Sequence, residues 1–126
     1  MSDPRRRLGA SGERLAAGHL EERGYRVLDR NVRRREGEVD LIAIDPSGSA
    51  PVLVFVEVKL RRPRATGGAL EALSQHKQRR LQSLAEIYAS EHPELPADLR
   101  IDLVAIDLAA DGSVAAFQHV ENAVEG

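Results

Sequence analysis

Apolar and polar residues recur with the period of a helix in two segments of this chain. The first segment predicts a helix that begins near Ser11, a favourable N-cap residue, and ends at Gly24. The apolar residues on one face of this helix are Leu15, Ala16, Ala17 and Leu20. The second segment predicts a helix over residues 69–90, with an apolar face made of Leu70, Leu73, Leu81, Leu84 and Tyr88.

Other segments have the alternating or continuous apolar pattern of strands, namely residues 25–31, 38–45, 52–60, 101–106 and 114–120. The segment 52–60 is the most apolar and is predicted to be a central strand covered on both faces. Turns are predicted at 33–37, 46–49 and Asp111-Gly112. This order of elements predicts a mixed sheet flanked by helices, which is a three-layer α/β/α domain of the α/β class.

The composition is that of one domain. The chain has 126 residues, of which 42% are hydrophobic, so it can form its own core. We expect a flexible basic arm at residues 1–10, one domain at 11–120 and a tail at 121–126. The absence of cysteine excludes disulfides and thiolate metal sites. No apolar run resembles a secretory signal or a membrane span, so we expect a cytoplasmic protein without a membrane partner.

Two of the predicted strands carry charged residues where a buried strand is normally apolar. Asp40 lies in the segment 38–45, while Glu57 and Lys59 share one face of the segment 52–60. If the strands pair as a hairpin, Asp40 comes close to Glu57, and two poorly solvated carboxylates repel each other. A divalent cation removes this repulsion, and Mg²⁺ or Mn²⁺ suits such oxygen ligands. Lys59 would then orient a water molecule and stabilise charge on a phosphate.

Each of these charged residues also has a structural interpretation. Glu57 and Lys59 alone would be an ordinary salt bridge, and their combination with Asp40 is what favours a site. Glu13 extends the apolar face of the first helix, so it is either an outer metal ligand reached through water or a first-turn acid favoured by the helix dipole. Lys77 interrupts the apolar face of the second helix and extends either to solvent or to the site or a phosphate.

Arginines are clustered, although the net charge of −2 gives no general attraction to nucleic acid. Two clusters flank the acidic strands and are interpreted as phosphate contacts that do not read sequence, namely Arg33, Arg34, Arg35, Arg61, Arg62 and Arg64. The alternative is that these clusters are solvated loops. Asp102 is expected to be a structural partner for an arginine. The four histidines show no ligand spacing, and the chain has no glycine-rich phosphate-binding motif.

Together, Glu13, Asp40, Glu57 and Lys59 resemble the motif of the PD-(D/E)xK nuclease superfamily, which includes restriction endonucleases and archaeal-type Holliday junction resolvases. The chain is more closely similar to the YraN-like family of small bacterial proteins, whose function is uncharacterised. The resemblance covers about residues 8–108. The segments that carry it are 12–16, 37–43 and 55–59, with Tyr25, Asn31, Lys77-Gln78 and Arg100-Ile101-Asp102. One departure is Val39, which stands where a proline would precede the acid.

The resemblance implies a restriction-endonuclease-like core in which Asp40, Glu57 and the Val58 carbonyl bind Mg²⁺ or Mn²⁺. Lys59 would be the catalytic lysine, and Glu13 the helical acid of resolvase-like members. The expected activity is hydrolysis of DNA, rather than RNA, by in-line attack of water, with branched DNA as one candidate substrate. The alternatives are a non-catalytic nucleic-acid-binding or adaptor module and a hydrolase of other phosphodiesters. Resolvase-like action would need two active sites and hence a homodimer.

Overall fold

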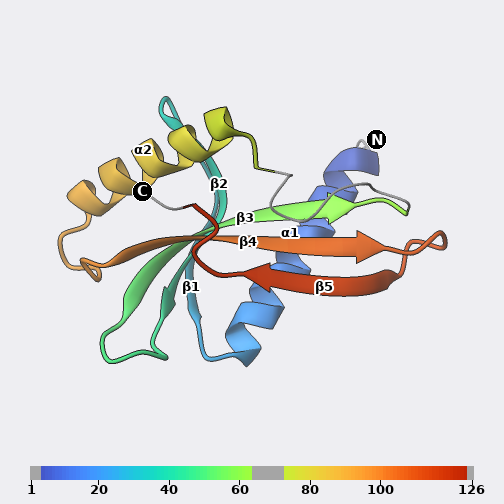
Figure 1. Cartoon of the computed structure of the whole chain (residues 1–126), viewed down its shortest axis with the longest axis horizontal. Helices are drawn as coiled ribbons and strands as arrows, with labels where there is room; N and C mark the ends of the chain where they lie inside the picture. The colour runs from blue at the N-terminus through green and yellow to red at the C-terminus, as the bar shows by residue number, and fades with distance from the viewer. Residues whose placement is uncertain (1–3, 64–72, 125–126) are drawn as a thin grey trace.

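The computed structural model describes residues 4–63 and 73–124, with side chains from residue 12 onwards. Within these ranges the chain forms two helices and five strands (Figure 1). The helices are α1 (Pro4–Glu22) and α2 (Gln75–Glu91). The strands are β1 (Arg26–Arg34), β2 (Gly37–Asp45), β3 (Val52–Arg61), β4 (Leu99–Leu108) and β5 (Val114–Val120).

The strands form one mixed sheet in the order β1-β2-β3-β4-β5. Strands β3 and β4 are parallel, and every other neighbouring pair is antiparallel. A parallel pair needs a long crossover connection, and α2 lies in the connection between β3 and β4. The predicted α/β fold with a mixed central sheet is therefore confirmed.

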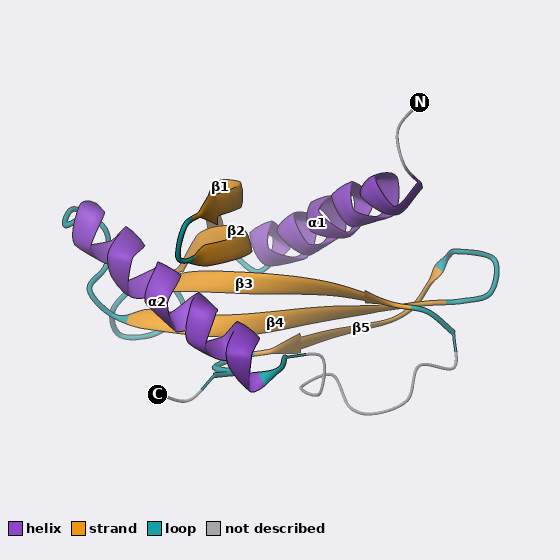
Figure 2. Ribbon diagram, turned by 90° about the horizontal axis from the view of Figure 1, so that it is seen from above, coloured by secondary structure: helices purple, strands orange, loops and turns teal. Residues whose placement is uncertain are grey.

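The two helices cover different sides of the sheet (Figures 1 and 2). In β3, Leu53 and Phe55 pack in the core beneath α2, whereas Val54 and Val56 pack in the core beneath α1. All four side chains are fully buried, as predicted for a central strand covered on both faces. By the same alternation, Glu57 and Lys59 lie on the face of β3 that Leu53 and Phe55 share, which is the face toward α2.

Helix α1 begins at Pro4 rather than near Ser11, so most of the segment expected to be a flexible arm is helical. Proline fits the first turn of a helix, and the arginines and alanine that follow favour helix formation. Gly12 is accommodated because the helix approaches β3 there, where an added Cβ atom would lie 3.1 Å from Cγ of Leu60. The predicted end at Gly24 is confirmed, and Gly24 has a left-handed φ of +86°.

Strand β1 is longer than predicted because Arg33 and Arg34 belong to it rather than to the turn. They pair in register with Glu38 and Gly37, so the turn contains only residues 35–36. The beginning of the tail packs on the sheet, where the Ala123 amide donates a hydrogen bond of 2.7 Å to the Ile101 carbonyl. The second helix, predicted over residues 69–90, begins only at Gln75 with Ser74 as its N-cap, so the prediction was wrong for residues 73–74, and residues 69–72 lie outside the described residues.

No helix in the described ranges has the combination of length and apolar character that crossing a bilayer requires.

Candidate functional site

The regular pairing of β2 with β3 ends beside the predicted acids. The last backbone pair is Leu41 with Val56. Beyond it the side chain of Asp40 replaces the backbone, because its Oδ2 atom accepts a hydrogen bond of 2.7 Å from the Val58 amide. This hydrogen bond fixes the Asp40 carboxylate against the residue that follows Glu57.

Asp40 and Glu57 come together as a hydrogen-bonded pair of carboxyl groups. Glu57 is only 7% exposed, and burial raises its pKa to about 6, helped by the negative charge of Asp40 and opposed by Lys77. Burial also raises the pKa of Asp40, although the Val58 amide opposes the change. Their mutual hydrogen bond raises the pKa of Glu57 and lowers that of Asp40, so the two acids titrate as a pair.

Lys77 contacts this acid pair from the first turn of α2. The Ser74 hydroxyl caps the helix by accepting a hydrogen bond of 3.1 Å from the Lys77 amide. The Nζ atom of Lys77 lies 2.5 Å from Oε1 of Glu57. Of the two interpretations open from the sequence, the structure therefore favours the one in which Lys77 reaches the site.

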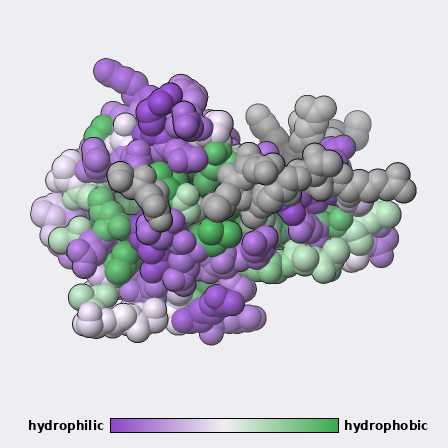
Figure 3. All heavy atoms as spheres, in the orientation of Figure 1, coloured by the Kyte–Doolittle hydropathy of each residue, from purple (hydrophilic) through white to green (hydrophobic). Residues whose placement is uncertain are grey.

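The acid pair lies in the wall of a cavity of about 340 Å³. Its lining residues come from β2, β3 and the beginning of α2, and they are Glu38, Asp40, Glu57, Ser74, His76, Lys77 and Arg80. Hydrophilic residues gather over α2 and the β1–β2 turn on the face shown in Figure 3. Gly37 lets β2 approach α2 closely, because an added Cβ atom would lie 3.3 Å from both Cβ and the carbonyl oxygen of Arg80. Sequence reasoning did not place His76 or Arg80 at this cavity.

Glu13 approaches Asp40 from α1, on the other side of the sheet from α2. Burial raises the pKa of Glu13, a hydrogen bond from the Asn31 side chain opposes this rise, and the charge of Asp40 adds to it. Asn31 has a left-handed φ of 52°, a conformation that asparagine tolerates better than most residues. An asparagine inside a predicted strand was therefore a signal for this position.

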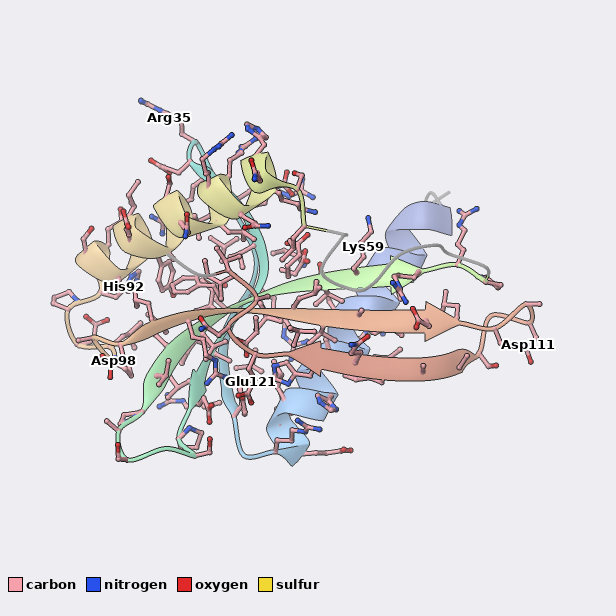
Figure 4. All side chains as sticks on the ribbon, viewed as in Figure 1. Arg35, Lys59, His92, Asp98, Asp111 and Glu121 are labelled. Atoms are coloured by element: carbon pink, nitrogen blue, oxygen red, sulfur yellow. The ribbon has the colours of Figure 1, made fainter. Side chains whose placement is uncertain are left out.

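Lys59 is placed differently from Lys77. It shares the parity of Glu57 along β3, but its side chain is exposed and projects from the strand (Figure 4). Among the described residues that line the cavity, Lys77 is the only lysine. Lys59 is not among the described residues that line the cavity, and the lysine that contacts Glu57 comes from α2.

The predicted phosphate-binding arginines fall into two groups. Arg34 forms an ion pair with Glu91, and Arg61 binds Asp107 with an Nε–Oδ1 distance of 2.6 Å. Arg33, Arg35 and Arg62 are exposed, and Arg35 projects from the β1–β2 turn (Figure 4). Arg64 lies outside the described residues. The exposed group is the one available to a large polyanion.

Asp102 belongs to a separate buried network, as expected for a structural partner of an arginine. It is fully buried and accepts hydrogen bonds from Arg100 (2.8 Å), His119 (2.8 Å) and the Asn122 amide (3.0 Å). Burial opposes its ionisation, but the hydrogen bonds from His119 and Arg100 hold the pKa of Asp102 below its usual range. Arg100 also binds Asp45 and Tyr25, two partners that the sequence did not indicate.

Comparisons with known proteins place the chain in a family. Residues 12–106 match the model of the uncharacterised protein family UPF0102. A UPF0102 protein of Symbiobacterium thermophilum is 48% identical over 107 residues, which are 85% of this chain and 87% of that protein. A UPF0102 protein of Pelotomaculum thermopropionicum is 40% identical over 98% of this chain and 99% of its own length.

Among solved structures, SfsA of Pyrococcus furiosus in complex with Ca²⁺ matches with a TM-score of 0.43 and 20% identity, covering 96% of this chain and 65% of that chain. The family match and the relatives confirm the kinship with YraN-like proteins that the sequence indicated. This chain therefore belongs to the UPF0102 family.

Proposed function

We propose that this protein is a divalent-metal-dependent nuclease that hydrolyses phosphodiester bonds of DNA. The observation that carries the proposal is the Asp40–Glu57 pair, in which a half-buried and a buried carboxyl group interact at the wall of a cavity. A pair that serves only the fold gains little from this arrangement, because burial and like charge both disfavour it. Perturbed carboxylates in a cleft are typical of functional sites.

The residues of the pair fit a hard divalent cation. Asp40 and Glu57 would hold Mg²⁺ or Mn²⁺ between their carboxylates, and the Val58 carbonyl is a further candidate ligand. Within residues 4–63 and 73–124, no three acidic or histidine side chains form a ligand set. Two carboxylates are compatible with Mg²⁺, which usually retains several water molecules. When bound, such an ion activates a water nucleophile and offsets negative charge on the phosphate.

The residues around the acid pair would orient its carboxylates and bind the phosphates of the substrate. The Val58 amide fixes the orientation of Asp40, while Asn31 holds Glu13 close enough for its charge to act on Asp40. Lys59, exposed on the same face of β3 as Glu57, would position the nucleophile or a phosphate oxygen. The exposed residues Arg33, Arg35 and Arg62 would contact DNA phosphates without reading sequence.

The activity is tested with one panel of substrates. The protein is incubated with linear, flapped and four-way DNA and with RNA, in Mg²⁺, Mn²⁺ or EDTA, beside Asp40→Asn and Lys59→Ala. We expect metal-dependent cleavage of DNA that both substitutions reduce by about a hundredfold or more. Cleavage that persists in both variants would identify a contaminating nuclease and overturn the proposal.

Binding without cleavage has a different meaning. If wild type and both variants bind DNA equally and none cleaves it, the protein is a non-catalytic binding module on this fold. Cleavage of small phosphodiesters without affinity for DNA would instead indicate another hydrolase. For a four-way substrate we expect two copies of the chain per junction, because both strands must be cut, and sedimentation of the complex measures this number.

A further inference from the structure

The two lysines of this chain occupy special positions. The sequence contains sixteen arginines but only Lys59 and Lys77 as lysines. One lies two residues after Glu57 on β3, and the other contacts Glu57 directly with an Nζ–Oε1 distance of 2.5 Å. Every other basic side chain is an arginine, including the neighbours Arg79 and Arg80 on α2. The residue that contacts Glu57 is therefore a lysine in a chain that otherwise uses arginine, which indicates that this contact favours lysine.

We propose that Lys77 is a built-in counter-ion of the acid pair, which a divalent cation displaces when it binds between Asp40 and Glu57. This inference rests on the proposed function, because it assumes that the pair binds a cation. It adds a regulation of the same site, in which the Lys77 ammonium occupies the position beside Glu57 until a divalent cation takes its place. It also assigns the freed ammonium group to a second partner, a phosphate group of the substrate.

Charge balance supports the exchange. In the metal-free site, the Lys77 ammonium lies against Glu57 and offsets part of the negative charge of the two carboxyl groups. In the metal-bound site, a dication balances both carboxylates, so the ammonium is surplus. Lys77 then keeps its charge but loses its partner. A free cation beside a metal ion is then placed to bind a phosphate oxygen.

The geometry allows this movement. The Glu57 side chain is 9% exposed and held in β3, whereas the Lys77 side chain is 43% exposed at the opening of the cavity. The Ser74 cap fixes the backbone of Lys77, so its four-carbon side chain is the moving part. Lysine suits a displaceable ion because its ammonium is a compact point charge, whereas the planar fork of an arginine would bind a carboxylate through two hydrogen bonds.

The first test is metal binding rather than cleavage. The affinity for Mn²⁺ is measured by titration calorimetry in 150 mM salt for wild type, Lys77→Met, Arg79→Met and Asp40→Asn. Removing the competing ammonium should tighten Mn²⁺ binding in Lys77→Met by about tenfold. Arg79→Met is the matched control because it removes one positive charge from the same helix at an exposed position, where salt screens the charge. Asp40→Asn should abolish binding.

The second test needs no variant. With only two lysines, the side-chain ammonium signals in a ¹H–¹⁵N spectrum are readily assigned. The Lys77 signal should be protected in the metal-free protein and lost on saturation with Mg²⁺, while Asp40→Asn retains it. If wild type binds Mn²⁺ through Asp40 but Lys77→Met gains no more affinity than Arg79→Met and the Lys77 signal persists, the exchange is wrong although the metal site is real. If wild type binds no Mn²⁺, both proposals fail.

Discussion

The carboxylate of Asp40 accepts a hydrogen bond of 2.7 Å from the backbone amide of Val58, at the point where backbone pairing between β2 and β3 has ended. A side chain thus performs the role of the missing backbone acceptor and, in doing so, is held beside Glu57. The Asp40 carboxylate therefore both stabilises the sheet and forms part of the proposed metal site. Substitutions at position 40 can distinguish the two roles, because the hydrogen bond needs only an acceptor atom, whereas metal binding needs the negative charge.

Asp40→Asn and Asp40→Ala should differ in stability but not in activity. The amide oxygen of asparagine can still accept the Val58 hydrogen bond, whereas alanine leaves that amide unpaired at a cost of about 1–3 kcal/mol. Both variants lose the charge and should lose cleavage. Urea denaturation measured in EDTA, beside the cleavage assay, checks both effects. Equal stability of the two variants would mean that this hydrogen bond contributes nothing to the fold.

Glu57 should make the stability of the metal-free protein fall as pH rises. Its pKa is raised to about 6 in the folded protein, above the ordinary value of about 4.5 for a solvated glutamate. The folded state therefore binds more protons than the unfolded state between these values, and the free energy of unfolding decreases across that window. The loss is of order 2 kcal/mol, and it is complete above pH 6.

Glu57→Gln removes this titration. The difference in unfolding free energy between wild type and Glu57→Gln, measured in EDTA from pH 4 to 7.5, should change in the window between the two pKa values and stay flat above it. Glu38→Gln is the matched control, because Glu38 lines the same cavity with an exposed side chain. A flat difference curve throughout would show that Glu57 is not the group that holds the proton.

Asp102 is expected to contribute to the free energy of unfolding and not to the affinity for Mn²⁺. Replacing it with alanine leaves the largely buried Arg100 without its main partner and removes four hydrogen bonds, so a loss of about 3–5 kcal/mol is expected. The fraction that remains folded should bind Mn²⁺ with the wild-type affinity. Denaturation curves combined with metal titration at low temperature test this, and a loss of metal affinity without a loss of stability would contradict it.

The sequence predicted the sheet well because its signals are local. Alternation in the segment 52–60 placed Glu57 and Lys59 on one face, and the hairpin that follows from neighbouring strands brought Asp40 to Glu57. The sequence left the contact between Lys77 and the site as one of two interpretations, because the choice depends on how far α2 lies from β3 and where its first turn begins. The start of α1 was missed because Ser11 has the pattern of an N-cap residue, whereas the helix already begins at Pro4.

Gly37 should control the distance between β2 and α2. Its φ of +156° is unusual for other residues, and an added Cβ atom would lie 3.3 Å from Cβ and the carbonyl oxygen of Arg80. Gly37→Ala is therefore expected to destabilise the protein by about 1–2 kcal/mol. It should also weaken Mn²⁺ binding, because β2 carries Asp40 and shifts with the turn. Gly18→Ala is the control, since a Cβ atom there meets nothing within 4 Å and alanine favours a helix. Unfolding and Mn²⁺ titrations of both variants test this, and equal behaviour would show that the close approach at Gly37 is not needed.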